Sequence, residues 1–522
     1  MRKLLLGDEA VALGAMHAGL SGVYAYPGTP STEITEYIQK NAPQVRSRWC
    51  TNEKTAMEAA LGMSYAGKRA LVCMKHVGMN VCADAFVNSA ITGVNGGIVV
   101  LAADDPSMHS SQNEQDSRFY GKFAMVPVFE PCNQQEAYDL VREAFEESER
   151  TGLPALLRVV TRLAHSRAAV QVREPLPQKP LAPSESRGWI LLPGIARRQY
   201  ASLVGKQPDL AAAAGKAASL EPASAAGKAP GVVACGIAYN YVREALGTEA
   251  GKYNILRINR YPLPVEKIRS LAAESSSILV VEDGQPFAEE GVAAALDAGY
   301  PVRGRLTGDL PRTGELTPDC VARALGFAPA EGFEPAKAIA ARPPQLCPGC
   351  GHRDVYAALN KVAAEFPGSR IFGDIGCYTL GALPPYSALA SCVDMGASIT
   401  MAKGAADAGL GPAIAVIGDS TFTHSGMTGL LDAVNDRSAI TVIISDNLTT
   451  AMTGGQDSAG TSKYEAICLG LGVEPEHLHV VVPTPANIPA IADLIRKEIA
   501  YDGVSVIIPR RECMQTLKRH KK

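Results

Sequence analysis

The 522-residue sequence contains no apolar run approaching the ~18 residues that a membrane-spanning helix needs. Near its start, two basic residues precede only Leu4-Leu5-Leu6, which is too short for the core of a secretory signal. Fifty basic and 53 acidic residues give a net charge of −3, so there is no basic excess to bind nucleic acid or an anionic membrane. We therefore expect a cytoplasmic protein with no membrane span and no nucleic-acid partner.

The composition is that of a folded protein with many turns. Apolar residues make up 47% and charged residues 20%, so a large core can be buried and disorder is excluded as the main state. The 49 glycines and 35 prolines are typical of a loop-rich α/β protein. At this length the chain is expected to form about three to four domains.

Short apolar runs alternate with helical patterns through the first 165 residues, which predicts a parallel sheet with helices on both faces. A proline-rich and then low-complexity segment follows and is interpreted as a linker with one or two helices. Two further α/β patterns come after it. The predicted segments are a first domain over 1–170, the linker over 171–230, a smaller domain over 231–335 and a last domain over 340–522.

The most informative segment is Gly418-Asp419-Ser420, followed 28 residues after the aspartate by Asn447. A predicted strand ends just before each of these sites, and the interval suits one strand–helix–strand crossover. Both side-chain oxygens should therefore meet at the carboxyl edge of a sheet, where such folds bind ligands. Carboxylate and amide oxygens suit Mg²⁺, which usually also takes phosphate oxygens.

Two local features add to this prediction. Gly418 would let the backbone approach a phosphate closely, and a helix beginning near Ser425 could point its N-terminus at the anion. Gly-Asp-Ser alone is more often an ordinary turn. The spacing, with a strand before each ligand, instead matches the thiamine diphosphate motif, in which Gly-Asp-Gly/Ser is followed at a similar distance by Asn.

Thiamine diphosphate chemistry also needs a carboxylic acid beside the aminopyrimidine ring, on a separate pyrimidine-binding domain. Glu53 directly precedes a predicted helix over 54–67, which is the expected local setting. The alternative for Glu53 is a charge favoured by the helix dipole. Glu58 is a competing candidate, ranked lower because it lies inside the helix.

Cysteines form a third cluster. In a reducing compartment the twelve cysteines are not expected to form a disulfide framework. Cys347 and Cys350 flank a Pro-Gly turn, and Cys377 follows a glycine. Two thiolates with this spacing suit tetrahedral metal or iron–sulfur ligation, and the alternative is a pair of free cysteines in a turn.

The fourth ligand decides between metals. His352 would complete a Cys₃His zinc site, whereas a [4Fe–4S] cluster takes four cysteines. Cys513 is the best fourth cysteine, because it lies in a loop just past a predicted strand over 504–508. Cys392 is another candidate, and Cys468 has the apolar neighbours of a core residue.

These segments together resemble the large (α) subunits of indolepyruvate:ferredoxin oxidoreductases, in the 2-oxoacid:ferredoxin oxidoreductase superfamily. The motifs that carry the resemblance are YPGTPS at 26–31, NEK at 52–54, MKHVGMN at 74–80, CPGCGH at 347–352, GDIGCYTLG at 373–381, GDSTF at 418–422 and DNLTTAMTG at 446–454. They run through most of the chain and are long enough to be highly specific.

The resemblance implies a thiamine-diphosphate-binding α/β fold with two doubly wound parallel-sheet domains. The pyrimidine-binding domain would be 1–170, a transketolase-C-terminal-like domain 231–335, and the diphosphate-binding domain with the cysteine cluster 340–522. The implied reaction converts a 2-oxoacid, typically an arylpyruvate such as indolepyruvate, and CoA to acyl-CoA and CO₂ while an acceptor is reduced.

The resemblance also implies residue roles. Glu53 would activate the aminopyrimidine, Thr29 would lie near the thiazolium and substrate, Lys75 and His76 would belong to the pocket, and Arg118 is a candidate for the substrate carboxylate. The implied metal ligands are Asp419, Asn447 and the Thr449 carbonyl for Mg²⁺, and Cys347, Cys350, Cys377 and Cys513 for a [4Fe–4S] cluster. The other implied cofactor-binding residues are Gly376, Tyr378, Met395, Gly396, Gly418, Ser420, Thr421, Thr450, Ala451 and Met452.

One departure from the family concerns electron transfer. Large subunits of this family usually continue with a ferredoxin-like domain that holds two more clusters, whereas this sequence ends nine residues after Cys513. We expect electrons to pass from at most one cluster to a partner subunit or a carrier such as ferredoxin. The expected partner is the family's small (β) subunit, in a hetero-oligomer with two large subunits.

Two alternatives remain open. A non-oxidative thiamine-diphosphate-dependent 2-oxoacid decarboxylase would use the same cofactor domains but would have no use for four clustered cysteines. A non-catalytic zinc-binding subunit would hold its ion with Cys347, Cys350 and His352.

Overall fold

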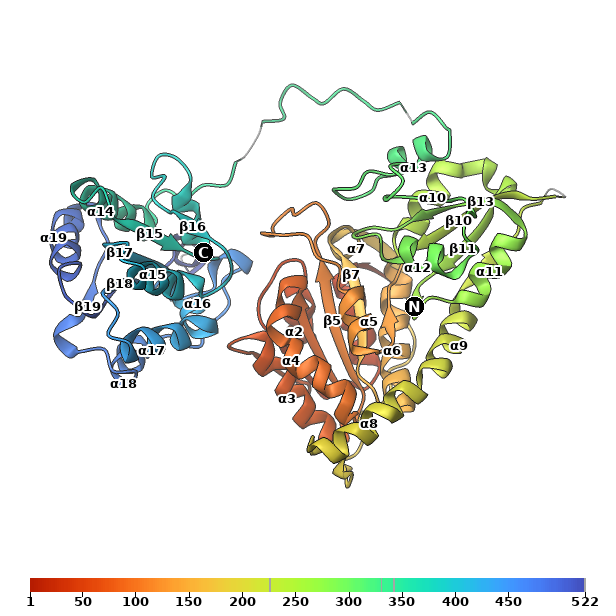
Figure 1. Cartoon of the computed structure of the whole chain (residues 1–522), viewed down its shortest axis with the longest axis horizontal. Coiled ribbons are helices and arrows are strands. Elements are labelled where there is room, and N and C mark those ends of the chain that lie inside the picture. The colour runs from red at the N-terminus through yellow and green to blue at the C-terminus, as the bar shows by residue number, and fades with distance from the viewer. Residues whose placement is uncertain (225–226, 330, 341–342, 521–522) are drawn as a thin grey trace. The chain divides into compact units, whose positions relative to one another are not determined.

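The apolar runs of the sequence form the strands of three large sheets in the computed structural model (Figure 1). The structure describes residues 1–224, 227–329, 331–340 and 343–520, and the chain divides into two units, Met1–Phe333 and Glu334–Lys522. Parts of the two predicted Pro/Ala-rich connections, at 225–226, 330 and 341–342, lie outside the described residues.

A seven-stranded sheet organises the first part of unit 1. Its strand order is β12-β6-β7-β5-β4-β2-β3, and all neighbours are parallel except β12 and β6. Its strands are β2 (Gly22–Ala25), β3 (Arg46–Trp49), β4 (Ala70–Lys75), β5 (Ile98–Asp104), β6 (Val128–Phe129), β7 (Ala155–Val160) and β12 (Arg260–Tyr261). The strands predicted near 70–74, 97–102 and 156–160 are therefore confirmed.

Helices cover both faces of this sheet, as the alternating pattern predicts. Its helices are α1 (Gly7–His17), α2 (Thr32–Asn41), α3 (Glu53–Tyr65), α4 (His76–Thr92), α5 (Arg118–Ala124), α6 (Gln134–Thr151) and α7 (Thr161–His165). Alternate residues of β4 belong to different cores. Leu71 and Cys73 pack with α1, α2 and α6, whereas Val72 and Met74 pack with α3 and α4. A separate antiparallel pair joins β1 (Arg2–Leu6) to β8 (Arg167–Gln171).

A five-stranded sheet forms the rest of unit 1, in the order β14-β13-β10-β11-β9. Its strands are β9 (Ser219–Glu221), β10 (Ala229–Cys235), β11 (Asn254–Ile258), β13 (Ser275–Val281) and β14 (Val302–Arg303), and its helices are α10 (Ala238–Leu246), α11 (Val265–Ala273), α12 (Phe287–Ala295) and α13 (Pro318–Ala324). The predicted linker contains α8 (Pro193–Gly205) and α9 (Gln207–Ala217), and it also supplies β9 to this sheet. Since β12 follows β11 but pairs with β6, the two sheets share one continuous stretch of chain.

Fully buried arginines fasten these two sheets together. Arg158 on β7 lies 2.6 Å from the carboxylate of Asp104 and also pairs with Glu130. Its other nitrogen donates to the carbonyl of Asp283, past the end of β13, over 2.8 Å. Arg118 pairs in the same way with Glu282, at 2.9 Å. Hydrogen bonds to charged groups inside a low-dielectric core are strong, so these contacts hold one sheet against the other.

Unit 2 is built on a six-stranded parallel sheet in the order β16-β15-β17-β18-β20-β19. Its strands are β15 (Arg370–Gly373), β16 (Ser391–Cys392), β17 (Ala413–Gly418), β18 (Ile440–Ser445), β19 (Leu478–Val481) and β20 (Val504–Pro509). Helices α15 (Ala397–Asp407), α17 (Met427–Asn435) and α18 (Tyr464–Gly470) pack on one face, and α14 (Gly351–Glu365) and α19 (Ile488–Glu498) on the other. A final helix, α20 (Met514–His520), closes the described chain.

Both units therefore have the predicted α/β class, with parallel sheets covered by helices on two faces. None of the described helices combines the length and apolar character that crossing a bilayer requires.

The buried arginines give a prediction about stability. Replacing Arg158 with methionine leaves the buried carboxylate of Asp104 without its cation, so the free energy of unfolding of unit 1 should fall by about 3–5 kcal/mol. Both tryptophans, Trp49 and Trp189, lie in unit 1, so urea unfolding followed by tryptophan fluorescence reports on this unit.

The matched control is Arg142→Met. Arg142 pairs with Glu146 on the surface of α6, where both side chains are partly exposed, so its loss should cost less than about 1 kcal/mol. Equal losses for the two variants would contradict a special role for the buried network.

Candidate functional site

Asp419 and Asn447 lie at the carboxyl ends of two adjacent parallel strands, β17 and β18. The backbone amide of Thr449 donates to Asp419 Oδ2 over 3.2 Å and to Asn447 Oδ1 over 3.1 Å. Leu448, between them, has a φ of 64°, the left-handed conformation that lets the chain fold back in so short a turn. The structure thus brings together the two side chains whose convergence the spacing predicted.

The helix beside this turn begins earlier than expected. Helical backbone starts at Asp419 and continues through α16 (Asp419–Thr421) and a π-helical turn, η4 (Phe422–Gly426), into α17. The expected start near Ser425 was wrong because the π-helical turn carries the chain from the strand into α17 without a break. Asp419 is therefore the first helical residue, and the free amides of the first turn lie next to its carboxylate. Such π-turns are frequent at functional sites.

The base of this site is buried. The side chain of Asp419 is 2% exposed, and burial together with the nearby Asp446 carboxylate raises the pKa of Asp419 to about 8. A bound cation stabilises the charged form of such an acid and would oppose this shift. The carboxylate of Asp419, the amide oxygen of Asn447 and the backbone turn at Thr449 form an oxygen donor set that fits Mg²⁺ bridging to a phosphate group.

Tyr378 explains why glycines are needed at two predicted cofactor positions. A Cβ at Gly418 would lie 2.5 Å from the Tyr378 ring, and one at Gly376 would lie 2.2 Å from it. The tyrosine hydroxyl donates to Asp374, which also accepts a 2.7 Å hydrogen bond from Ser398. Burial raises the pKa of Asp374 to about 6. The sequence analysis did not single out Asp374, although it lies within one of the quoted motifs.

The remaining predicted cofactor residues surround the same strand ends. Gly396 caps α15 with a φ of 93°, and a Cβ there would lie 2.6 Å from Ser425. Thr450 Oγ1 donates to Ser420 Oγ over 3.0 Å, and Thr421 Oγ1 donates to the Ile375 carbonyl over 3.0 Å. Met395 directly precedes Gly396, and Ala451 and Met452 begin a short 3₁₀ helix, η5 (Ala451–Thr453).

The four predicted cluster cysteines line one cavity of about 170 Å³ in unit 2. Cys347 and Cys350 precede α14, Cys377 follows β15, and Cys513 follows β20. Burial, together with the other three thiols, raises the pKa of Cys377 to about 12, so a cation is needed to hold the group as thiolates. Four cysteines around one cavity fit the donor set of a [4Fe–4S] cluster.

The zinc alternative fits this cavity less well. Thiolates about 2.3 Å from a tetrahedral zinc ion lie roughly 3.8 Å from one another. Within the described ranges, no three of the cavity's Cys and His ligand atoms lie within 4.8 Å of one another. His352 also lines the cavity, and burial lowers its pKa to about 4, so its ring is neutral. Cys392 is exposed and Cys468 belongs to the core, as its apolar neighbours predict.

Backbone hydrogen bonds join the cysteine cavity to the Asp419–Asn447 turn. The amide of Cys513 donates to the carbonyl of Asn447 over 3.1 Å, and the amide of Arg511 donates to the carbonyl of Asp446 over 3.0 Å. Asp446 and Asn447 themselves line the cavity. A group held by the cysteines and one held by the turn would therefore be neighbours within unit 2.

In unit 1, Glu53 is the first residue of α3 and its side chain is 5% exposed. Asn52 caps the helix by accepting a 2.9 Å hydrogen bond from the Thr55 amide. The carboxylate packs against α4, where a Cβ at Gly78 would lie 2.7 Å from Glu53 Oε1. Glu58 is exposed and pairs with Lys54. Burial therefore favours Glu53 over Glu58, as the sequence analysis ranked them.

Thr29, Lys75 and His76 lie past the ends of the neighbouring strands β2 and β4. Lys75 Nζ donates to the Ser110 carbonyl over 2.6 Å, and burial lowers the pKa of Lys75 to about 8. A Cβ at Gly28 would lie 3.1 Å from the Lys75 Cβ, so the turn that bears Thr29 lies against this lysine. His76 is buried at the start of α4.

Arg118 has a different environment from the one expected. Its side chain is 0% exposed and is held by Asp116, Glu282 and the hydroxyl of Tyr261. These partners leave the guanidinium no exposed face, so its geometry gives no support to binding of a substrate carboxylate. Its place in the sequence gave no signal of this, because four of its partners come from distant segments.

Comparisons with known proteins agree with both halves of this site. Residues 13–186 match the family described as "Pyruvate flavodoxin/ferredoxin oxidoreductase, thiamine diP-bdg", and residues 374–507 match "Thiamine pyrophosphate enzyme, C-terminal TPP binding domain". The chain is 38% identical to the indolepyruvate oxidoreductase subunit IorA of Archaeoglobus fulgidus, over 98% of this chain and 86% of that protein. It is 36% identical, with the same coverage, to the subunit of that name from Pyrococcus abyssi.

A solved structure shares the fold. The 2-oxoglutarate:ferredoxin oxidoreductase of Magnetococcus marinus is similar over 62% of this chain and 65% of its own, with a TM-score of 0.51 at 16% identity.

Proposed function

Because this chain belongs to the family of indolepyruvate oxidoreductase IorA subunits, we propose that its own residues hold thiamine diphosphate, Mg²⁺ and one [4Fe–4S] cluster in the roles given below. The chain is a thiamine-diphosphate-dependent enzyme of oxidative 2-oxoacid decarboxylation. The observation that carries the proposal is the hydrogen-bonded link between the four-cysteine cavity and the Asp419–Asn447 turn. A non-oxidative decarboxylase has no use for such a cavity and is not favoured.

The reaction balances as 2-oxoacid, CoA and oxidised acceptor giving acyl-CoA, CO₂ and reduced acceptor. The bond to the substrate carboxylate breaks, and its electron pair stays with the acyl carbon. Two electrons then pass to the acceptor, the thiol proton leaves, and the thioester bond to CoA forms. We propose an arylpyruvate such as indolepyruvate as the substrate, since the relatives carry that substrate in their names.

Thiamine diphosphate supplies the carbon that adds to the keto group and accommodates the electron pair left by CO₂. The Glu53 carboxyl exchanges a proton with the aminopyrimidine, at a position where water is excluded by burial against α4. Thr29, Lys75 and His76 form part of the substrate pocket. These roles belong to a pyrimidine-binding domain over 1–170, with 231–335 as the transketolase-C-terminal-like domain.

The diphosphate-binding role belongs to residues 340–522. Asp419, Asn447 and the Thr449 carbonyl hold Mg²⁺, and the amides at the start of the helix face the phosphate charge. Gly376 and Gly418 allow the close packing around Tyr378 that shapes this end of the site.

Electron transfer completes the proposal. Cys347, Cys350, Cys377 and Cys513 hold a [4Fe–4S] cluster that takes electrons one at a time from the bound substrate. The electrons leave to a small (β) partner subunit, in a hetero-oligomer, and to a carrier such as ferredoxin. The support for a partner is that the relatives are named as subunits.

Removing one cluster cysteine tests this proposal. In anaerobically purified Cys377→Ser, iron and acid-labile sulfide should fall well below the ~4 of each that one cluster brings. Viologen reduction that depends on both arylpyruvate and CoA should fall by at least about tenfold. Cys392→Ser is the matched control, because Cys392 is exposed and lies outside the cavity, and it should keep both. Aldehyde release without CoA, unchanged in Cys377→Ser, would instead support a decarboxylase.

A glycine on α4 allows Glu53 to be displaced without altering it. The added methyl of Gly78→Ala would meet the flexible end of the Glu53 side chain, so the carboxylate must move while the helix is preserved. We expect kcat to fall by on the order of 10- to 100-fold with KM for thiamine diphosphate nearly unchanged.

The control for that variant is Gly62→Ala on α3, where a Cβ meets nothing within 4 Å. It should leave kcat unchanged and raise stability by about 0.4–1 kcal/mol. Full activity in Gly78→Ala would show that the placement of Glu53 is not what the enzyme requires.

The Mg²⁺ role is tested by binding. Asp419→Asn removes the charged ligand, so thiamine diphosphate should bind at least about tenfold more weakly in the presence of Mg²⁺, as measured by calorimetry. The exposed Asp432→Asn on α17 makes the same charge change and should bind normally. Equal affinity in the two variants would remove Asp419 from the metal site.

A further inference from the structure

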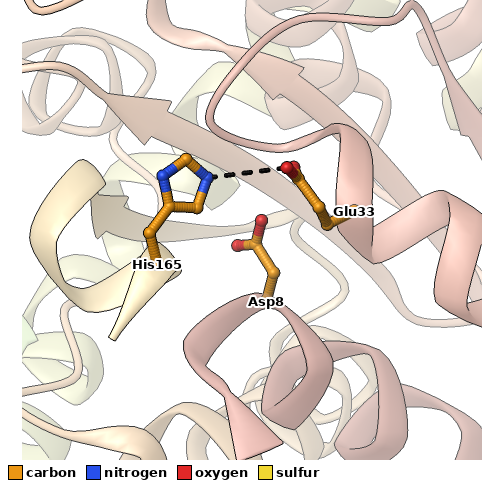
Figure 2. Close-up of side chains that lie close together, drawn as sticks. All are labelled: Asp8, Glu33 and His165. Carbon is orange, nitrogen blue, oxygen red and sulfur yellow. Dashed lines mark ion pairs between the residues drawn. The ribbon is translucent and has the colours of Figure 1, made fainter. Parts of the chain in front are cut away.

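A second group of possible ligands lies in unit 1 and is not used by the proposed function. Asp8 is in the first turn of α1, Glu33 is in the first turn of α2, and His165 is the last residue of α7. Figure 2 shows the Asp8 carboxylate pointing toward the other two side chains. One ligand atom from each residue lies within 4.8 Å of the other two. Three helices that are far apart in the sequence therefore converge at one point.

Asp8 is the unusual member of this group. Its side chain is 0% exposed, and neither carboxylate oxygen accepts a hydrogen bond. Its nearest charged neighbours are acids: burial, and then the charge of Glu33, raises the pKa of Asp8 well above its usual range. A buried carboxyl group without a donor is costly, so either a proton or a cation has to compensate it.

The geometry of the other two residues favours a cation. His165 Nε2 lies 3.7 Å from Glu33 Oε1, which is too far for a hydrogen bond. Ligands about 2.0–2.2 Å from a tetrahedral zinc ion lie roughly 3.4 Å apart, close to this separation. The side chains of His165 and Glu33 are 37% and 41% exposed, so an ion can enter from solvent and keep a water ligand.

We propose that Asp8, Glu33 and His165 bind one divalent first-row transition-metal ion, such as Zn²⁺, with water completing its coordination. One imidazole nitrogen and two carboxylates suit Zn²⁺, Mn²⁺ or Fe²⁺ better than Mg²⁺, which prefers oxygen ligands alone. The ion has a structural role. It fixes the start of α2, four residues after Thr29, to α1 and α7.

The rival arrangement contains no metal. In it, Asp8 keeps its proton and donates it to Glu33, and His165 interacts with Glu33 only as a loose ion pair. The two arrangements differ in whether loss of one ligand changes the metal content of the protein, and this can be measured independently of enzyme activity.

The test uses the full-length chain, treated with chelator and then dialysed against buffered Zn²⁺ at neutral pH. Zinc per chain is counted by mass spectrometry in the wild type, Asp8→Asn, Glu33→Gln and His165→Gln. Each variant should bind one zinc ion fewer than the wild type. Zinc taken up by the cysteine cavity or at Asp419 is common to all four proteins and cancels in the difference.

The matched control is Glu36→Gln, one turn further along α2, where the side chain is exposed and the charge change is the same. It should bind as much zinc as the wild type. His165→Gln keeps the test decisive if Asp8→Asn fails to fold, because His165 is exposed. Equal zinc in the wild type, Glu33→Gln and His165→Gln would overturn the proposal and support the shared proton.

Cobalt gives a second readout. The difference spectrum between Co²⁺-loaded wild type and Glu33→Gln should show weak visible bands without a thiolate charge-transfer band, because none of the three ligands is a cysteine. A thiolate band in that difference would place the lost ion in the cysteine cavity and contradict the proposal.

Discussion

The parallel pairing of β17 with β18 is the constraint on which the cofactor site depends. Their register pairs Gly418 with Ser445, so the residues that follow both strands emerge at the same edge of the sheet. A slip of one residue would point Asp419 or Asn447 at the opposite face, because strand side chains alternate. Every residue of β17 and β18 is buried, which fixes this register through the packing of both faces.

The same edge also explains how two different groups of ligands come to be neighbours. Four adjacent strands, β15, β17, β18 and β20, are followed in turn by Cys377, Asp419, Asn447 and Cys513. The oxygen ligands follow the two inner strands, and the cysteines follow the two outer ones. Because neighbouring strands lie about 4.8 Å apart, a redox group held by the outer pair is kept close to a cofactor held by the inner pair. One-electron oxidation of a cofactor-bound substrate requires this proximity.

Sequence reasoning recovered the parts of this site that are local or that follow from strand spacing. The Asp419–Asn447 interval, the choice of Cys513 as the fourth cavity cysteine and the burial of Glu53 all follow from where a strand ends or a helix begins. It failed where distant segments decide. The π-helical turn moved the start of the helix to Asp419, and Arg118 is held by carboxylates up to 164 residues away, at Glu282. Neither the turn nor those partners leave a periodic signal in the sequence.

Three buried aspartates show how the fold compensates charge. Asp104 lies 2.6 Å from the buried guanidinium of Arg158, so the chain supplies its own cation. Asp419 and Asp8 have no such partner among the described residues, and in both cases burial and a neighbouring acid raise the pKa. A fold that can bury an arginine against one acid but leaves two others without one keeps those two positions available for external cations. At Asp419 the cation accompanies a diphosphate. At Asp8, where Glu33 and His165 complete the donor set, the same reasoning leads to a metal ion that joins three helices.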